Sequence, residues 1–342
     1  CKKKETKYNI RNKYLEIIYD EPRPKLNKFI KKKITKIYFL NHACVIIDCG
    51  DIKFATDPWI FGPAFCNGWW LSKKSPKNSI ELLNRCDFIF ISHNHPDHLH
   101  SLTLKKIKKS IPIITANFKS KSAENYLTSI GFKNVFSLDF GYDYICKKHN
   151  FSLSILKSGD FRDDSGIYFA NGKFTSILTV DSNFLNFFRF PKKISLLATS
   201  FASGASGYPL CFDNISEKNK RNITLRSKNA IKSINREIIS LTNPKFYMPY
   251  AGFFKESARR DIYIKKMNKK NKPSSFINIC NEFNSKLLDL DLYQNFIFNG
   301  EKIINKFSNK FHSNINENIE EHILEYKKKY KLPSKTKIIK YF

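Results

Sequence analysis

The sequence predicts an α/β protein in which two β-sheets lie face to face between layers of helices. Short β-rich runs open the chain, strands then alternate with helices, and a second series of strands follows. This order is typical of two packed sheets flanked by helices rather than of one doubly wound parallel sheet. An aromatic content of 15% and only 12 Gly indicate a packed globular core.

Runs at 35–40, 44–48 and 52–56 predict an antiparallel meander, because Asn/His and Gly/Asp turn signals separate them. After an apolar strand at 87–92, the spacing of apolar residues predicts a helix over 101–110, a strand over 111–115 and a helix over 121–131 that ends at a glycine. Further strands are expected at 151–156, 166–170, 174–180, 194–199 and 245–250, with a long helix over about 222–242 and an amphipathic segment at 318–330.

Composition narrows the choice of partners. The formal net charge of +30 is compatible with an anionic small-molecule substrate. Nucleic-acid binding is not expected as the main function, because no basic-aromatic recognition module is present. Eight Cys without a C-x-x-C pair indicate neither a zinc ribbon nor a disulfide scaffold, so a reducing, cytoplasmic setting is expected. The sequence contains no stretch of 18 apolar residues, so no membrane span is expected.

A cluster of histidines follows the strand at 87–92, in the sequence ISHNHPDHLH. His93 and His95 are two residues apart, so both rings face one way on an extended loop, at a distance suited to one ion. Asp97 and His98 come after a proline turn and can hold a second ion beside the first. The spacing H-x-H-x-D-H predicts a metal site, whereas His100 lies outside the pattern and is expected on the surface.

This motif resembles that of the metallo-β-lactamase superfamily, which implies an αββα four-layer sandwich. Four stretches narrow the resemblance to the metallo-β-lactamase-like domain of the CMP-N-acetylneuraminate hydroxylase family. They are TDPWIFGPAFCNGWWL (56–71), ISHNHPDHL (91–99), SFASGASGYP (200–209) and PYAGFF (249–254), within a resemblance that covers roughly 35–270. It implies an oxygenase that converts the N-acetyl group of CMP-sialic acid to N-glycolyl.

The resemblance also suggests residues that bind the substrate. On a loop with two glycines and a proline, the three tryptophans can wall a pocket or, equally, fill the core. The glycine-rich turn can form a nest of N–H groups for a phosphate or carboxylate, or serve only as a tight turn. The candidate substrate-binding residues are Trp59, Trp69, Trp70, Ser206, Gly207 and Tyr250.

The remaining ligands fit the family pattern only in part. The resemblance implies that Asp181 occupies the acidic position that can bridge two ions. The resemblance aligns Asp160 to a position where the family has a histidine, and Asp163 and Asp164 lie close by. It aligns Ala258 to the position of a second, later histidine of the family. Two histidines and one carboxylate favour iron(II) with open positions, while Zn and Mn are equally allowed by the residue types, and a vestigial site stays an alternative. One or two divalent ions, Fe or Zn, are therefore expected.

Relatives in this family carry an N-terminal Rieske domain, whose [2Fe–2S] cluster feeds electrons to the oxidation site. This sequence contains no such ligand set, but its first residues resemble the segment that follows the ligands. We therefore expect residues 1–30 to be a remnant of, or linker from, an upstream Rieske domain. Residues 31–290 are expected to form the metallo-β-lactamase-like domain, and residues 291–342 a peripheral Lys/Asn-rich extension.

Three functions stay open from the sequence. The first is a monooxygenase that acts on a CMP-activated acidic sugar with O₂ and electrons from a Rieske centre or another electron-transfer protein. The second is a hydrolase of an ester, lactone or phosphodiester, in which a metal-bound water attacks and Asp97 acts as the base or a second-ion ligand. The third is a binding domain with a decayed metal site.

Overall fold

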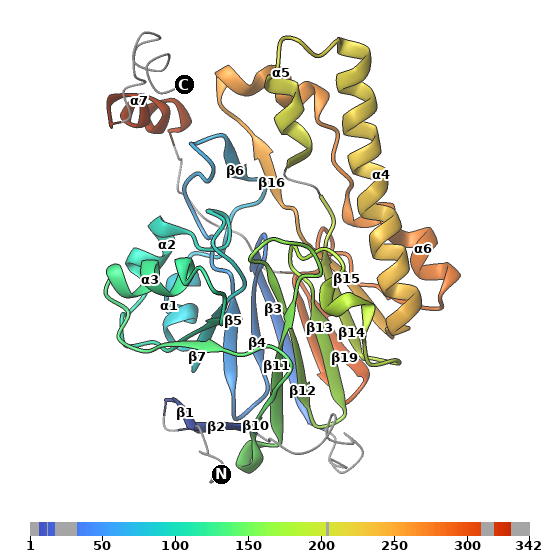
Figure 1. Ribbon diagram of the computed structural model, residues 1–342. Coiled ribbons are helices and arrows are strands. Elements are labelled where there is room, and N and C mark those ends of the chain that lie inside the picture. The colour runs from blue at the N-terminus through green and yellow to red at the C-terminus, as the bar shows by residue number, and fades with distance from the viewer. Residues whose placement is uncertain (1–6, 12, 18–32, 203–204, 309–317, 330–342) are drawn as a thin grey trace.

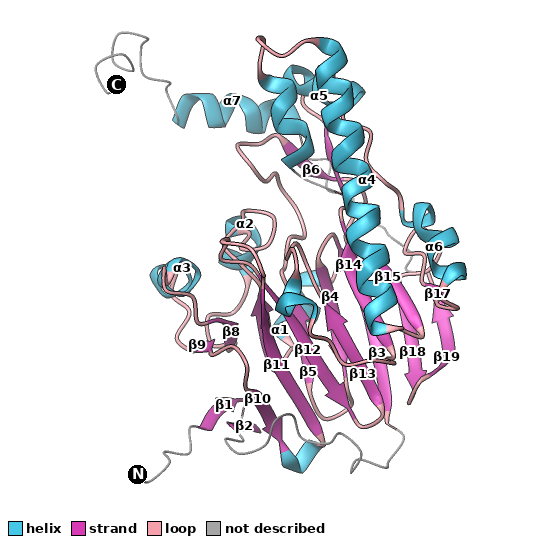
Figure 2. Cartoon of the chain, turned by 45° about the vertical axis from the view of Figure 1, so that its right-hand side comes forward, coloured by secondary structure: helices cyan, strands magenta, loops and turns pink. Residues whose placement is uncertain are grey.

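The computed structural model describes residues 7–11, 13–17, 33–202, 205–308 and 318–329. Within these ranges two large mixed sheets lie face to face, with helices on their outer sides (Figures 1 and 2). The predicted αββα sandwich is confirmed.

The first large sheet has eight strands in the spatial order β19-β18-β3-β4-β5-β7-β8-β9. Its strands β3, β4 and β5 form the predicted antiparallel meander, and β5, β7, β8 and β9 run parallel. Their bounds are β3 Ile34–Asn41, β4 Cys44–Asp48, β5 Lys53–Thr56, β7 Phe88–Ile91, β8 Ile113–Ala116, β9 Val135–Leu138, β18 Asn295–Asn299 and β19 Lys302–Phe307.

The second large sheet has nine strands in the order β1-β2-β10-β11-β12-β13-β14-β15-β17. Its centre is antiparallel from β10 to β13, and β13, β14, β15 and β17 run parallel. Their bounds are β1 Lys7–Ile10, β2 Lys13–Ile17, β10 Asp143–Cys146, β11 Phe151–Lys157, β12 Ser165–Asn171, β13 Phe174–Leu178, β14 Leu196–Ser200, β15 Phe246–Ala251 and β17 Lys286–Leu287.

Alternating side chains explain why the eight-stranded sheet is covered on both faces. In β7, Phe88 and Phe90 point into the core between the sheets, whereas Ile89 and Ile91 point into a second core under the helices. The inner core joins the two sheets through aromatic contacts such as Phe54 of β5 against Phe169 of β12, with 5.3 Å between ring centroids. A strand buried on both faces reads as a continuous apolar run, which is the pattern FIFI of β7.

Helices cover the outer faces as expected. Three short helices, α1 Ser79–Asn84, α2 Ser101–Lys106 and α3 Ser122–Ser129, bury apolar residues in the core under the eight-stranded sheet. The long helix α4, Glu217–Thr242, lies outside the nine-stranded sheet, with α6 Ile277–Glu282 beside it (Figure 2). Ser216 caps α4 by accepting from the backbone N–H of Asn219, and Asn243 ends it in a left-handed conformation. No helix of the described ranges is long and apolar enough to cross a membrane.

A small antiparallel sheet lies above the sandwich, near one end of α4 (Figure 1). It pairs β6 Trp69–Leu71 with β16 Phe254–Glu256, so that Trp69 lies opposite Glu256 and Trp70 opposite Lys255. The helices α5 Ile262–Met267 and α7 Ile319–Lys329 lie in the same upper part of the molecule.

The expected boundary at residue 290 is wrong. Strands β18 and β19 complete the eight-stranded sheet, and β18 pairs with β3 along its whole length. Phe298 of β18 packs against Phe174 of the facing sheet, so β18 contributes to the inner core. The sandwich therefore extends to at least residue 307, and only the later residues can form an extension.

Part of the segment 1–30 also belongs to the sandwich. Strands β1 and β2 form a hairpin that pairs with β10, and Ile10 and Leu15 are buried. Residues 1–6 and 18–32 lie outside the described residues. The expectation that this segment follows a Rieske domain stays a prediction.

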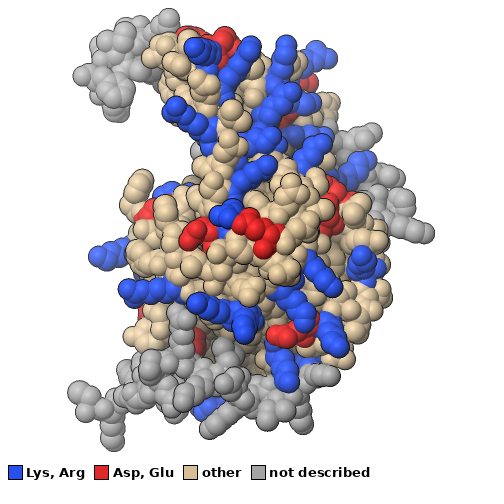
Figure 3. All heavy atoms as spheres, turned by 90° about the vertical axis from the view of Figure 1, so that its right-hand side faces the viewer, with Lys and Arg blue, Asp and Glu red and all other residues tan. Residues whose placement is uncertain are grey.

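Basic side chains crowd over the upper part of the face that carries α4 (Figure 3). Helix α4 itself contributes Lys218, Arg221, Arg226, Lys228, Lys232 and Arg236, against Glu217 and Glu237. Such a face raises the local concentration of anions.

Candidate metal centre

The histidine loop leaves the buried strand β7 at the edge where several other strands also deliver polar residues. Asp57 follows β5, which runs parallel to β7, and His42 lies in the turn just before β4. On the facing sheet, Asp164 precedes β12 and Asp181 follows β13, and because these two strands are antiparallel both carboxylates lie at one edge. The topology therefore gathers residues that are far apart in the sequence.

Three overlapping groups of these side chains could hold a metal ion. Within each group the ligand atoms lie within 4.8 Å of one another. One group contains both His93 and His98, and each of the other two groups contains one of them. This is the arrangement expected of two neighbouring ion positions with common or adjacent ligands. Their members are His42, Asp97 and His98; His93, His98 and Asp181; and His93, His95 and Asp164.

Individual distances show how tightly the centre is packed. Nε2 of His93 lies 2.8 Å from Nδ1 of His95. Nε2 of His98 lies 3.3 Å from Oδ2 of Asp97 and 3.4 Å from Oδ2 of Asp181. His93, Asp97 and His98 are buried, and His95 and Asp181 are half-buried.

Residues behind the centre orient the rings. Asp57 accepts from the backbone N–H of Ser92 at 2.8 Å, and its Oδ2 lies 3.1 Å from Nδ1 of His98. The Oγ atom of Ser92 lies 2.7 Å from the same carboxylate and 2.8 Å from Nδ1 of His93. In metal sites a carboxylate or hydroxyl on one ring nitrogen fixes the tautomer and leaves the other nitrogen for the metal. In both rings Nε2 is thereby the nitrogen that faces the other ligands of the centre and that a metal would bind.

The histidines and carboxylates of the centre shift one another's pKa. Burial alone would lower the pKa of His98, but the carboxylates of Asp97, Asp181 and Asp57 raise it well above its usual value. Burial, together with the neighbouring His98, lowers the pKa of His93 well below its usual value. Although burial opposes ionisation, His98 lowers the pKa of Asp181 to about 2.

Unsatisfied polar atoms test whether a metal fits here. Oδ1 of Asp97 and Nε2 of His98 are buried and make no hydrogen bond within the described residues. Leaving such atoms unpaired costs free energy, and a cation between them would remove that cost. The donor set of imidazole and carboxylate suits Zn, Fe or Mn. The residues present therefore fit a divalent metal ion.

Comparison with known proteins agrees with this geometry. The β-lactamase superfamily domain matches residues 36–152, which include the histidine loop. Residues 36–152 thus belong to a β-lactamase superfamily domain. It is 34% identical to the cytidine monophosphate-N-acetylneuraminic acid hydroxylase of Pongo pygmaeus over 251 residues, 71% of this chain and 43% of that protein. It is equally identical to the inactive hydroxylase of Homo sapiens, over 71% of this chain and 50% of that protein.

The chain thus spans half or less of the length of these relatives. Among solved structures, CmlA, a diiron β-hydroxylase from Streptomyces venezuelae, is similar with a TM-score of 0.46 and 13% identity, over 82% of this chain and 55% of that one. The predicted superfamily and the resemblance to the hydroxylase family are both confirmed.

One predicted ligand of this metallo-β-lactamase centre is misplaced. The carboxylate of Asp160 accepts hydrogen bonds from Ser158, Asn183 and Arg162, and it belongs to none of the groups that could hold a metal. Asp164 takes its place, with Oδ1 at 3.9 Å from Nε2 of His93. The reason is local: the backbone N–H of Gly159 bonds to the carbonyl of Asn183, which places Asp160 on that neighbouring loop.

His100 is buried, and the expectation of a surface position is wrong. Its Nδ1 accepts from the backbone N–H of Thr103 and caps α2, while Nε2 lies 3.1 Å from the carbonyl of Pro63. Burial lowers the pKa of His100 to about 4, so the ring is neutral. It is a satisfied core histidine.

Two residues of the centre were missed at the sequence level. His42 lies in an Asn-His turn that the sequence marks only as a turn signal. Asp57 directly follows β5, and an argument from the shared edge of parallel strands would have found it. Both positions have positive φ, 43° at His42 and 35° at Asp57. Backbone strain at such residues is typical of functional sites.

A cavity of about 760 Å³ opens beside the centre, and we call it the metal cavity. His95, Asp97 and Asp181 line one end of it. Helix α4 supplies an apolar wall, because Ile231, Ile234 and Ile238 recur on one helical face. The lining also contains Arg162, Arg260, Trp69, Glu256 and Asp261. Its size and mixture of apolar and polar groups suit a small organic substrate.

Of the three predicted substrate-binding tryptophans, one lines the metal cavity and two do not. Trp69 lines the metal cavity and stacks on Phe254 with 4.0 Å between ring centroids. Trp59 is fully buried, donates to the carbonyl of Gly62 and packs against His42, so it fills the core. Trp70 is buried and does not line the metal cavity.

The other predicted contacts have different environments. Gly207 lines the metal cavity, where an added Cβ would come within 3.1 Å of Asn268 and 3.2 Å of Ile264, so close packing alone explains the glycine. The side chain of Ser206 lies outside the described residues. Tyr250 is fully buried in β15 and does not line the cavity. A direct role of these residues in binding stays a prediction.

Proposed function

We propose that this chain is the metal-holding part of an oxygenase that hydroxylates the N-acyl group of a CMP-sialic-acid-like nucleotide sugar. The observation that carries the proposal is the 34% identity to hydroxylases of that substrate over 71% of the chain. A metal cavity of about 760 Å³ with two arginines at its wall is compatible with an anionic sugar nucleotide.

Six side chains would hold the metal ion, which would supply the redox chemistry with O₂ that amino-acid side chains lack. They are His93, His95, His98, Asp97, Asp164 and Asp181. Hydroxylation inserts one oxygen atom of O₂ into a C–H bond and reduces the other to water, with two electrons and two protons. A Rieske centre or another electron-transfer protein is the proposed donor of those electrons.

The chain's own residues would bind and orient the substrate in the metal cavity. Helix α4 and Trp69 exclude water from one wall of the metal cavity. Arg162 bonds to Asp160 and Asp164, and Arg260 to Asp261, so their charges are partly compensated. Each also donates through Nη2 to a backbone carbonyl, Arg162 to that of Asp181 and Arg260 to that of Cys66. A guanidinium has five N–H groups, so each side chain can still donate to a carboxylate or phosphate.

Hydrolysis of an ester, lactone or phosphodiester is the second candidate, and the free Oδ1 of Asp97 favours it. Burial would raise the pKa of Asp97, but His98 and His42 hold it well below its usual value. The carboxylate is therefore ionised at neutral pH and can accept a proton from an attacking water. A non-catalytic domain is the third candidate, since one relative is named inactive.

One experiment separates the three. Iron-loaded protein is reduced chemically, mixed with CMP-sialic acid and exposed to ¹⁸O₂, and the product is analysed by mass spectrometry. In parallel, zinc-loaded protein is incubated anaerobically with a panel of esters, lactones and phosphodiesters. A sugar that has gained labelled oxygen supports the oxygenase, cleavage in the panel supports the hydrolase, and neither product from protein with full metal content supports the binding domain. The His93→Ala variant is the negative control in both arms.

A further inference from the structure

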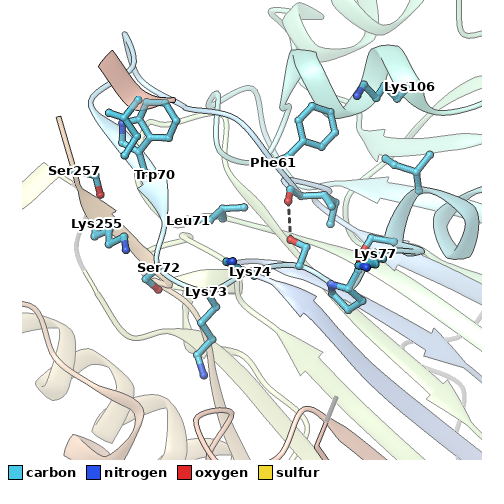
Figure 4. Close-up of a pocket in the computed structure, with 16 residues that line it drawn as sticks. Phe61, Trp70, Leu71, Ser72, Lys73, Lys74, Lys77, Lys106, Lys255 and Ser257 are labelled. Atoms are coloured by element: carbon cyan, nitrogen blue, oxygen red, sulfur yellow. Dashed lines mark hydrogen bonds between the residues drawn. The ribbon is translucent and has the colours of Figure 1, made fainter. Parts of the chain in front are cut away.

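A second pocket of about 710 Å³ lies on the other side of the β6–β16 sheet (Figure 4). We call it the lysine pocket. Side chains alternate across a strand, so Trp69 and Glu256 face the metal cavity, whereas their neighbours Trp70 and Lys255 face the lysine pocket. No described residue lines both. The lysine pocket is therefore separate from the proposed reaction site.

Its lining is strongly cationic. Five lysines converge from three parts of the chain, and no Asp or Glu stands among the lining residues. The lysines are Lys73, Lys74, Lys77, Lys106 and Lys255. The lining also contains Phe61, Trp70 and Leu71, and in Figure 4 Lys106 lies beside Phe61, while Lys73 points away from Trp70 and Leu71.

Only one of these lysines is neutralised by a carboxylate within the described residues. Lys73 lies 2.7 Å from Asp291 and donates to the carbonyl of Leu290. Lys106 lies over the ring of Phe61 at 4.4 Å, a contact that leaves its charge uncompensated. Lys74, Lys77 and Lys255 make no ion pair with a described residue. Like charges held around one hollow repel one another, and an anion bound there would relieve that repulsion.

The pocket lining also contains hydroxyl groups that could complement such an anion. The Oγ atom of Ser257 is buried and has no hydrogen-bond partner within the described residues. The hydroxyl of Ser75 is already used, since it donates to the carbonyl of Ile60. An unpaired hydroxyl and four uncompensated ammonium groups in one pocket lining are a donor set for phosphate oxygens, and Phe61 and Trp70 give an apolar surface in the same lining.

We propose that the lysine pocket is a second binding site, for a small molecule that carries a diphosphate and an apolar or aromatic part. Lysine binds phosphate as a mobile point charge, and several lysines around one hollow suit more than one phosphate group. The volume falls in the range of small-molecule sites, which favours a small ligand over an acidic protein. The proposal does not depend on the reaction at the metal centre.

The test is calorimetric titration of the metal-loaded protein with ADP, at low and high salt. We expect saturable binding that weakens with salt. The Lys74→Ala/Lys77→Ala variant should raise the Kd by roughly 100-fold, about ten-fold for each hydrogen bond to a charged group that is lost. The matched control is Lys265→Ala/Lys266→Ala, a pair of exposed lysines on α5 outside the pocket.

Two further measurements assign the site. Trp69→Leu alters only the metal cavity and should leave the Kd for ADP unchanged, and thermal unfolding should show that all variants fold alike. No saturable binding by the wild type would overturn the proposal. So would equal loss of binding in the two lysine variants, or loss of binding in Trp69→Leu with retention in Lys74→Ala/Lys77→Ala.

Discussion

Nε2 of His42 lies 3.1 Å from Oδ2 of Asp97, and Nδ1 of the same ring accepts from the backbone N–H of Gly252 at 3.4 Å. The second contact fixes the tautomer, so the ring donates to Asp97 through Nε2. Only Oδ1 of that carboxylate is then left without a partner. His42 therefore orients Asp97 toward the metal centre.

Removal of this contact should weaken metal binding. His42→Phe keeps an aromatic ring but no donor, and we expect the metal dissociation constant to rise by about 10- to 100-fold, as for other groups that orient ligands. Competition with a chelator measures it. His100→Asn is the control, because asparagine can still cap α2 and His100 takes no part in the centre. Equal affinities of wild type and His42→Phe would show that Asp97 needs no such support.

The two aspartates of the 158–164 loop should behave differently. Asp164→Asn is expected to lower the metal content of the purified protein, because Asp164 joins His93 and His95 in one ligand group. Asp160→Asn should leave it unchanged, since Asp160 is engaged by Arg162 and Asn183. Metal analysis of both variants decides, and the reverse order would restore Asp160 as the ligand expected from the sequence.

Metal binding should release a proton from His98. The pKa of His98 is raised well above 6.5 in the metal-free protein, mainly by Asp97 against the effect of burial, so the ring is charged at pH 7. A metal needs the neutral ring, and apparent affinity should therefore rise by about ten-fold per pH unit below that pKa. His93 is already neutral because burial lowers its pKa. Calorimetry in buffers of different ionisation enthalpy counts the protons, and a count of zero at pH 7 would contradict a charged His98.

A glycine in β12 should prove intolerant of a side chain. A Cβ at Gly166 would lie 2.6 Å from the carbonyl oxygen of Leu178 and 2.8 Å from Leu185. We expect Gly166→Ala to lower the free energy of unfolding by about 1–3 kcal/mol through overpacking. Gly141→Ala is the comparison, since its site is open and only its φ of 83° opposes alanine, at about 1 kcal/mol. Denaturant unfolding should show the larger loss for Gly166→Ala.

The sandwich could be predicted because its strands and helices carry clear periodicity. The apolar run FIFI of β7 and the helical spacing of α4 appear at the expected positions. Strands β9 and β19 were missed, because half-buried or exposed positions hide their alternation, as in KIINKF of β19. Their place depends on partners distant in the chain, which no local pattern records.

The histidine loop could be predicted because its ligands are close in sequence. Asp181 was found through resemblance, and the structure places it in the centre. Asp164 and His42 could not be chosen in advance, because several carboxylates and turns compete and only loop packing decides which side chain points inward. The position of Trp70 away from the metal cavity follows from the pleat of a three-residue strand, a feature with no signal in the sequence.

The β6–β16 sheet has a consequence for how this chain can change during evolution. Trp69 and Trp70 serve opposite surfaces only because they are adjacent in one strand. A single inserted or deleted residue before Trp69 would exchange the two indoles and disturb both surfaces at once. This pair of strands therefore tolerates replacement of individual residues better than a change in length, and the two surfaces are inherited together.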